Sequence, residues 1–84
     1  MSALTIENLQ LLPVGRYNIS ICFNEGVLEV GHDEKYTSSK TYRFHRGDDS
    51  LRIEIENGIA TAKKMVCGLM LSFDILSDKI IIIE

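Results

Sequence analysis

Hydrophobic and polar residues alternate along most of the chain from Tyr17 onward, with the period of two that a half-buried β-strand requires. Residues typical of turns separate these short segments, notably Asn24-Glu25-Gly26, Gly47-Asp48-Asp49-Ser50 and Asn57-Gly58. The pattern predicts an all-β or mainly β fold, in which six to seven strands form an antiparallel meander curled into a small barrel or sandwich. Because 84 residues are too few for two domains, residues 1–84 are expected to form one.

The Asn57-Gly58 pair is the clearest hairpin signal, because Asn-Gly favours the type I′ turn that joins two strands through two residues. Residues 51–56 should therefore pair with residues 59–64. This register sets Ile53 opposite Ala62, so that both lie on the apolar face of the hairpin.

Two further hairpins are expected earlier in the chain. The turn that precedes residues 51–56 is expected to be a four-residue connection, which would set Phe44 opposite Ile53 on the same apolar face. A turn at Asn24-Glu25-Gly26 would likewise set Phe23 opposite Leu28.

Residues Met65–Leu76 fit both a helical stripe and a strand. The strand is favoured, because Gly68 destabilises a helix interior by roughly 1 kcal/mol relative to alanine. Ser77-Asp78 would then form a tight turn that sets Ile75 against Ile80.

A short helix is compatible with residues 5–11, since Thr5 can serve as its N-cap and Pro13 follows its end. Such a helix would cover an open end of the barrel or the second face of the sheet. The leucines of this segment form no clean stripe, so a strand remains an alternative.

The run Ile80–Ile83 is apolar on both faces of a strand, because successive side chains point to opposite sides. Ile81 and Ile83 therefore need a cover of their own. Two interpretations stay open. In the first, the N-terminal leucines, or strand curvature that closes a barrel, cover them. In the second, they lie on an edge strand that pairs with another protein or with a second copy of the chain, which would give a homodimer.

Composition and motifs narrow the classes of function. A net charge of −3, from 9 basic and 12 acidic side chains, provides no overall field that would attract nucleic acid. Cys22 and Cys67 form no Cys-x-x-Cys pair and are expected to be buried free thiols. No residue spacing matches a metal site, and no motif of a nucleophile or cofactor occurs, so we expect no enzyme, no cofactor and no metal. No stretch approaches the roughly 18 apolar residues that span a bilayer, which predicts a cytoplasmic protein that binds no membrane.

The predicted registers gather basic residues on the solvent face of the sheet. His45, Arg52 and Lys63 would form one row, with Arg43 and Arg46 close by. Guanidinium groups bind carboxylates and phosphates, so this row is a candidate surface for an acidic partner. The residues predicted to bind a partner are Arg43, His45, Arg46, Arg52, Lys63, Ile81 and Ile83.

The sequence thus favours a non-enzymatic protein-binding module that acts through a sheet face or an edge strand. A stoichiometric inhibitor, such as a phage-encoded antagonist of host defence or an immunity protein, would have this character. The alternative is a small β-barrel that binds nucleic acid. It is less favoured because the predicted core takes most of the aromatic residues and leaves only Tyr36 as a platform for stacking a base.

Overall fold

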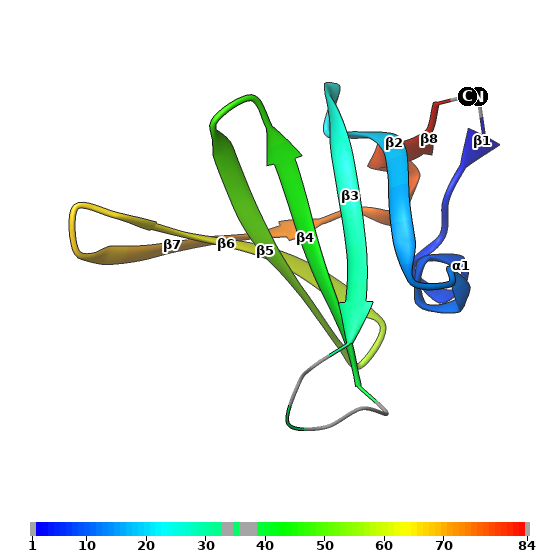
Figure 1. Ribbon diagram of the computed structural model, residues 1–84, viewed down its shortest axis with the longest axis horizontal. Helices are drawn as coiled ribbons and strands as arrows, with labels where there is room; N and C mark the ends of the chain where they lie inside the picture. The colour runs from blue at the N-terminus through cyan, green and yellow to red at the C-terminus, as the bar shows by residue number, and fades with distance from the viewer. Residues whose placement is uncertain (1, 33–34, 36–38, 84) are drawn as a thin grey trace.

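The computed structural model describes residues 2–32, 35 and 39–83, and most of them belong to one antiparallel sheet (Figure 1). Helix α1 (Ile6–Leu11) and a turn of 3-10 helix, η1 (Ser77–Lys79), complete this part of the chain. The strands are β1 (Ser2–Ala3), β2 (Gly15–Ile21), β3 (Asn24–His32), β4 (Lys40–Arg46), β5 (Asp49–Glu56), β6 (Ile59–Val66), β7 (Leu69–Ile75) and β8 (Ile80–Ile82).

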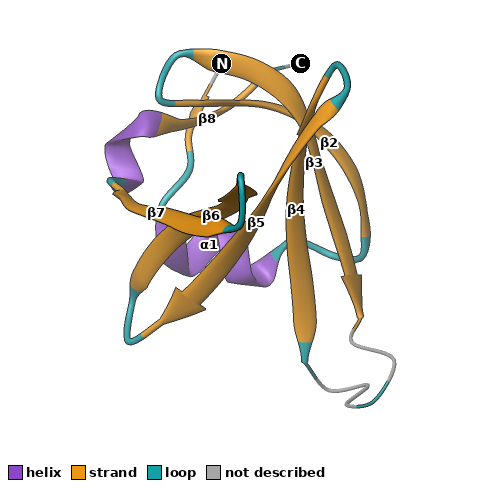
Figure 2. Ribbon diagram, turned by 90° about the vertical axis from the view of Figure 1, so that its left-hand side faces the viewer, coloured by secondary structure: helices purple, strands orange, loops and turns teal. Residues whose placement is uncertain are grey.

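The strands follow the order β1-β8-β2-β3-β4-β5-β6-β7. Strands β2 to β7 form a meander, and β8 returns to lie between β1 and β2. The sheet is curled, but β1 and β7 at the two ends of the order do not pair with each other. It therefore forms an open half-barrel (Figure 2). The prediction of a mainly β antiparallel meander with a short N-terminal helix is confirmed.

The hairpin of β5 and β6 has the predicted register. Asn57 and Gly58 both have positive φ, at 54° and 77°, as a type I′ turn requires. Ile53 lies opposite Ala62, and both side chains are buried. Local turn chemistry and the hydrophobic pattern therefore agree at this hairpin.

The turn between β4 and β5 is shorter than predicted. Two residues, Gly47 and Asp48, form the connection, so Phe44 lies opposite Leu51 rather than Ile53. Gly47 has a φ of +55°, which suits the first position of a two-residue type II′ turn. The predicted register is wrong by two residues. Because a shift by two preserves the face of a strand, Phe44 and Ile53 still point into the core.

The turn between β2 and β3 also lies elsewhere than predicted. Cys22 and Phe23 form it, with φ values of 50° and 68°, whereas Asn24-Glu25-Gly26 begins β3. Leu28 consequently pairs with Tyr17. The predicted pairing of Phe23 with Leu28 is wrong, and the Phe23 side chain is 80% exposed.

The ambiguous segment after Lys64 is a strand, as favoured. Strand β6 continues to Val66, Cys67 and Gly68 form a turn, and β7 follows. Ile75 lies opposite Ala60 of β6, so its predicted pairing with Ile80 is wrong. The residues after β7 form η1 instead of a tight turn, and the chain then crosses to the far end of the strand order.

Strand β8 is an interior strand of the sheet, so the interpretation that made it an edge strand is wrong. Ile82 lies opposite Ile19 of β2 on one side and Ser2 of β1 on the other. Ile80 is buried in the core, whereas Ile81 and Ile83 are half-buried and lie outside the core cluster. The N-terminal leucines do not cover these two side chains: Leu9 lies in the core, Leu12 packs against it and Leu11 is exposed.

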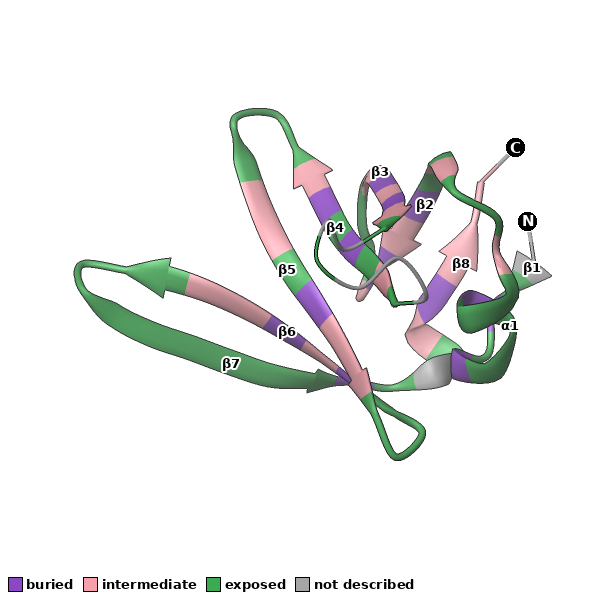
Figure 3. Cartoon of the chain, turned by 60° about the horizontal axis from the view of Figure 1, so that its bottom comes forward, coloured by how far each residue is buried: buried purple, intermediate pink, exposed green. Residues whose placement is uncertain are grey.

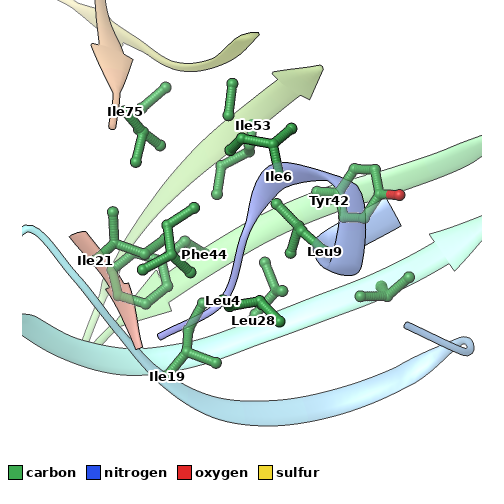
Figure 4. Packing of buried hydrophobic residues seen from close by; sticks show 14 residues of the cluster. Leu4, Ile6, Leu9, Ile19, Ile21, Leu28, Tyr42, Phe44, Ile53 and Ile75 are labelled. Carbon is green, nitrogen blue, oxygen red and sulfur yellow. The ribbon is translucent and has the colours of Figure 1, made fainter. Parts of the chain in front are cut away.

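Helix α1 covers the concave face of the half-barrel. Thr5 is its N-cap, as predicted, and its Oγ1 accepts a hydrogen bond of 3.1 Å from the backbone N–H of Asn8. Ile6 and Leu9 point from the helix into the core (Figure 4). In the part of the chain that the structure describes, no helix is long and apolar enough to cross a membrane.

Candidate interaction surface

Three basic side chains lie next to one another on the solvent face of the sheet. Arg43 of β4 lies opposite Arg52 of β5, and Arg52 lies opposite Lys63 of β6. The pairing of Arg52 with Lys63 was predicted. The shorter β4–β5 turn places Arg43, instead of His45, at the third position. We call Arg43, Arg52 and Lys63 the basic row.

Glu54 neutralises part of the basic row. Its Oε2 lies 2.6 Å from Lys63 Nζ, and its Oε1 lies 3.5 Å from Arg52 Nε. The hydrogen bond from Lys63, with the nearby charges, holds the pKa of Glu54 below its ordinary value of 4.5. Arg43 differs, because its Nη1 donates to Ser50 Oγ at 3.4 Å and no carboxylate pairs with it among the described residues. Its charge is therefore available to an external anion.

The basic row borders a groove of about 290 Å³ where the β6–β7 hairpin diverges from β5. The pairing of β5 with β6 ends at Lys63, and beyond it Lys64 Nζ bonds to Asp49 Oδ1 at 2.8 Å. Met65 and Met70 lie opposite each other on the hairpin, and both are exposed. We call this hollow the cationic groove; its lining residues are Arg43, Ser50, Arg52, Glu54, Lys63, Lys64, Met65 and Met70.

His45 and Arg46, which were predicted to join the basic residues at this surface, have other neighbours. His45 lies opposite Ser50, and its Nε2 is 3.5 Å from Glu29 Oε1. Together with Arg16, whose Nη2 is 2.9 Å from Glu29 Oε2, His45 lowers the pKa of Glu29 below 4.5. Arg46 lies at the end of β4 and is not part of the groove lining.

A larger open hollow of about 1110 Å³ lies where β4 and β5 separate. Their pairing ends at Tyr42 and Ile53, so the start of β4 and the end of β5 diverge. Lys40 lies at one side and donates hydrogen bonds of 3.0 and 2.7 Å to the carbonyls of Gln10 and Leu12. The lining mixes acidic and basic side chains, and the described residues contain no group of three side chains able to hold a metal ion.

The hairpin beyond the cationic groove is the most exposed apolar part of the structure. We call residues Met65–Phe73 the arm; it carries no charged residue and projects from the half-barrel (Figures 1 and 3). Eleven large apolar side chains are exposed in the described residues, and six of them belong to the arm. The interpretation of the sequence missed this surface. Nine consecutive residues without a charge were the signal that could have indicated it.

Comparison with known proteins adds no relative. No protein-family model, no curated protein and no solved structure matches this chain.

The structure brings together only some of the residues that were predicted to bind a partner. Arg43, Arg52 and Lys63 share the cationic groove. Ile81 and Ile83 lie on and after β8, at the opposite end of the strand order from the arm. The open edge with exposed apolar side chains is therefore β7, not the C-terminal isoleucine strand that the sequence suggested.

Proposed function

We propose that this chain is a non-enzymatic protein-binding module that takes an acidic partner surface into the cationic groove. The observation that supports this most directly is Arg43, a guanidinium in a row of cations that has no carboxylate partner among the described residues. Guanidinium can bind an external carboxylate through two parallel hydrogen bonds. The flexible side chains of Met65 and Met70 adapt to apolar surfaces of different shape. The partner would thus present a carboxylate next to apolar side chains.

A protein fits the cationic groove better than a nucleic acid does. Proteins that bind single strands stack bases on exposed aromatic rings. Among the described residues the groove lining contains no aromatic side chain, and Tyr42 and Phe44, which flank Arg43 on β4, are buried in the core. Glu54 would also place a carboxylate next to bound phosphates. These features favour a protein whose carboxylates are spread over its surface, rather than a nucleic acid, as the partner.

Such a module would act by occupying the surface of another protein. A stoichiometric inhibitor, such as an immunity protein or a phage-encoded antagonist of host defence, works in this way. It needs a complementary surface and no chemistry of its own, which is consistent with a groove lined mostly by cations and methionines.

The experiment is to isolate the partner from the source cells with the tagged chain, and then to titrate the purified partner by calorimetry. Arg43→Glu should weaken the affinity at least about tenfold. The substitution removes a hydrogen bond to a charged group, worth about 1.5–3 kcal/mol, and adds a like charge in its place.

Arg16→Glu is the matched control. Arg16 lies on the same solvent face, opposite Glu29, which in turn lies opposite Arg43. Arg16→Glu changes the net charge by the same amount as Arg43→Glu does, but at a position outside the groove. The affinity of this control should therefore stay as in the wild type. Equal affinity of wild type and Arg43→Glu, or equal losses in both variants, would contradict the proposal. Binding of an oligonucleotide that weakens steeply with salt would support the nucleic-acid alternative instead.

A further inference from the structure

Strand β7 is a seven-residue edge strand without the usual protection. It ends the strand order, so one side of its backbone has no partner strand in the described part of the chain. Edge strands of soluble proteins are commonly shielded by lysine, proline, a bulge or short length. Asp74 is the one charged residue of β7, which contains neither lysine nor proline. Its outer N–H and C=O groups are therefore open to another strand.

The side chains beside this edge are apolar and exposed. Leu69, Leu71 and Phe73 share the face of β7 that is buried at Ile75, but they lie beyond the core and are 69%, 54% and 49% exposed. Val66 of β6 lies opposite Leu69 and extends the same patch. Contiguous apolar patches on soluble proteins mark interaction sites.

We propose that β7 pairs antiparallel with β7 of a second copy of this chain, about a two-fold axis at Leu71. In such an antiparallel pair, the sequence numbers of any two residues that lie opposite each other give the same sum. Leu71 then lies opposite Leu71 of the second copy, and Leu69 lies opposite Phe73 of the second copy. Each apolar side chain on this face thus finds an apolar partner.

The charge pattern favours a second copy as the occupant. In this register Asp74 lies opposite Gly68 of the second copy, so it opposes neither a like charge nor an apolar side chain. On the other face, Met70 lies opposite Ser72 of the second copy. Because the arm carries no charge from Met65 to Phe73, the two arms do not repel each other.

The pairing would also cover exposed apolar surface on one face of the arm. Four exposed apolar side chains lie on that face and would be buried together with the newly paired backbone: Val66, Leu69, Leu71 and Phe73. The pairing would continue one sheet through both copies. It would leave the basic row uncovered, so the dimer and the proposed binding in the cationic groove can each fail independently.

The solution mass of the full chain over a dilution series, measured by sedimentation equilibrium, tests this pairing. The wild type should approach twice its mass of 9.5 kDa at high concentration and fall toward 9.5 kDa on dilution. Leu71→Lys and Leu71→Glu each set two like charges face to face at the axis, so each alone should stay monomeric. An equimolar mixture of the two variants should regain the dimer mass, because lysine then faces glutamate.

Leu11→Lys is the control, since it replaces an exposed leucine of α1 and should dimerise as the wild type does. Circular dichroism checks that the Leu71 variants fold, as the exposure of this side chain implies. A wild type that stays monomeric throughout would overturn the proposal and leave the arm to another protein or to a lipid surface. A Leu71→Lys variant that still dimerises, or a mixture that stays monomeric, would overturn it as well.

Discussion

Gly26 occupies a position in β3 where a side chain has no room. A Cβ atom there would lie 2.4 Å from the backbone oxygen of His45 and 2.8 Å from Cζ of Phe44. The close approach of β4 therefore requires the glycine. In the sequence, Asn24-Glu25-Gly26 resembles a turn, because a glycine that permits close packing cannot be told from one that permits a turn.

Replacing Gly26 by alanine should lower the free energy of unfolding by about 1–3 kcal/mol, the usual cost of overpacking a dense interior. The backbone oxygen of His45 cannot move aside without disturbing the β3–β4 pairing. Gly15→Ala is the control, because its nearest contacts lie 3.7–3.8 Å away on the ring of Tyr17. It should change stability by less than about 0.5 kcal/mol in urea denaturation. Similar losses in both variants would show that steric overlap at Gly26 is not the cause.

At the scale of elements, α1 is short but supplies an important part of the core. Leu9 is 1% exposed, beside Ile6 and Leu4 in the same cluster. Leu9→Ala should therefore cost about 2–5 kcal/mol, as large-to-small changes in cores do. Leu11→Ala, at a side chain that is 71% exposed on the same helix, should stay within about 0.5 kcal/mol of the wild type. Chemical denaturation measures both, and a small effect at Leu9 would mean that the helix is not needed to close the core.

Elements set by local chemistry could be predicted from the sequence. The Asn57-Gly58 hairpin and the Thr5 cap each depend on residues a few positions apart. The neighbours of β8 could not be predicted, because its pairing with β1 and β2 joins distant parts of the chain. The basic row lies between these cases. The predicted turn at Gly47-Asp48 was two residues too long, which kept each side chain on the correct face. It placed His45 beside Arg52, where the structure has Arg43.

The exposure of the arm depends on where the core ends, which is a property of the whole molecule. Leu71 and Phe73 continue the alternation of a buried strand, so the pattern alone assigns them to the interior. If β7 pairs across a two-fold axis perpendicular to the joined sheet, the two cationic grooves would face the same side. A partner with two acidic patches would then engage both copies and gain avidity.

Acid should destabilise the whole sheet through three carboxylates that pair with cations across strands. The pKa values of Glu29, Asp49 and Glu54 are lowered, chiefly by the neighbouring His45 side chain for Glu29 and by hydrogen bonds from Lys64 and Lys63 for Asp49 and Glu54. At acidic pH the unfolded chain therefore binds more protons at these carboxylates than the folded chain does. The ion pairs contribute their full stability when the pH is above the ordinary pKa values, which are 4.5 for glutamate and 3.8 for aspartate. This stability is lost as the pH falls through the lower pKa values of the folded chain.

Glu54→Gln isolates one of these contributions, because glutamine keeps the shape of the side chain but cannot ionise. Its free energy of unfolding should fall less steeply than that of the wild type as the pH drops below 4.5. Glu56→Gln, on the same strand and without an ion pair in the described residues, should retain the wild-type slope. Urea denaturation at a series of pH values gives the three slopes. If Glu54→Gln and wild type lose stability in parallel, the ion pairs of Glu54 with Arg52 and Lys63 do not contribute to folding in solution.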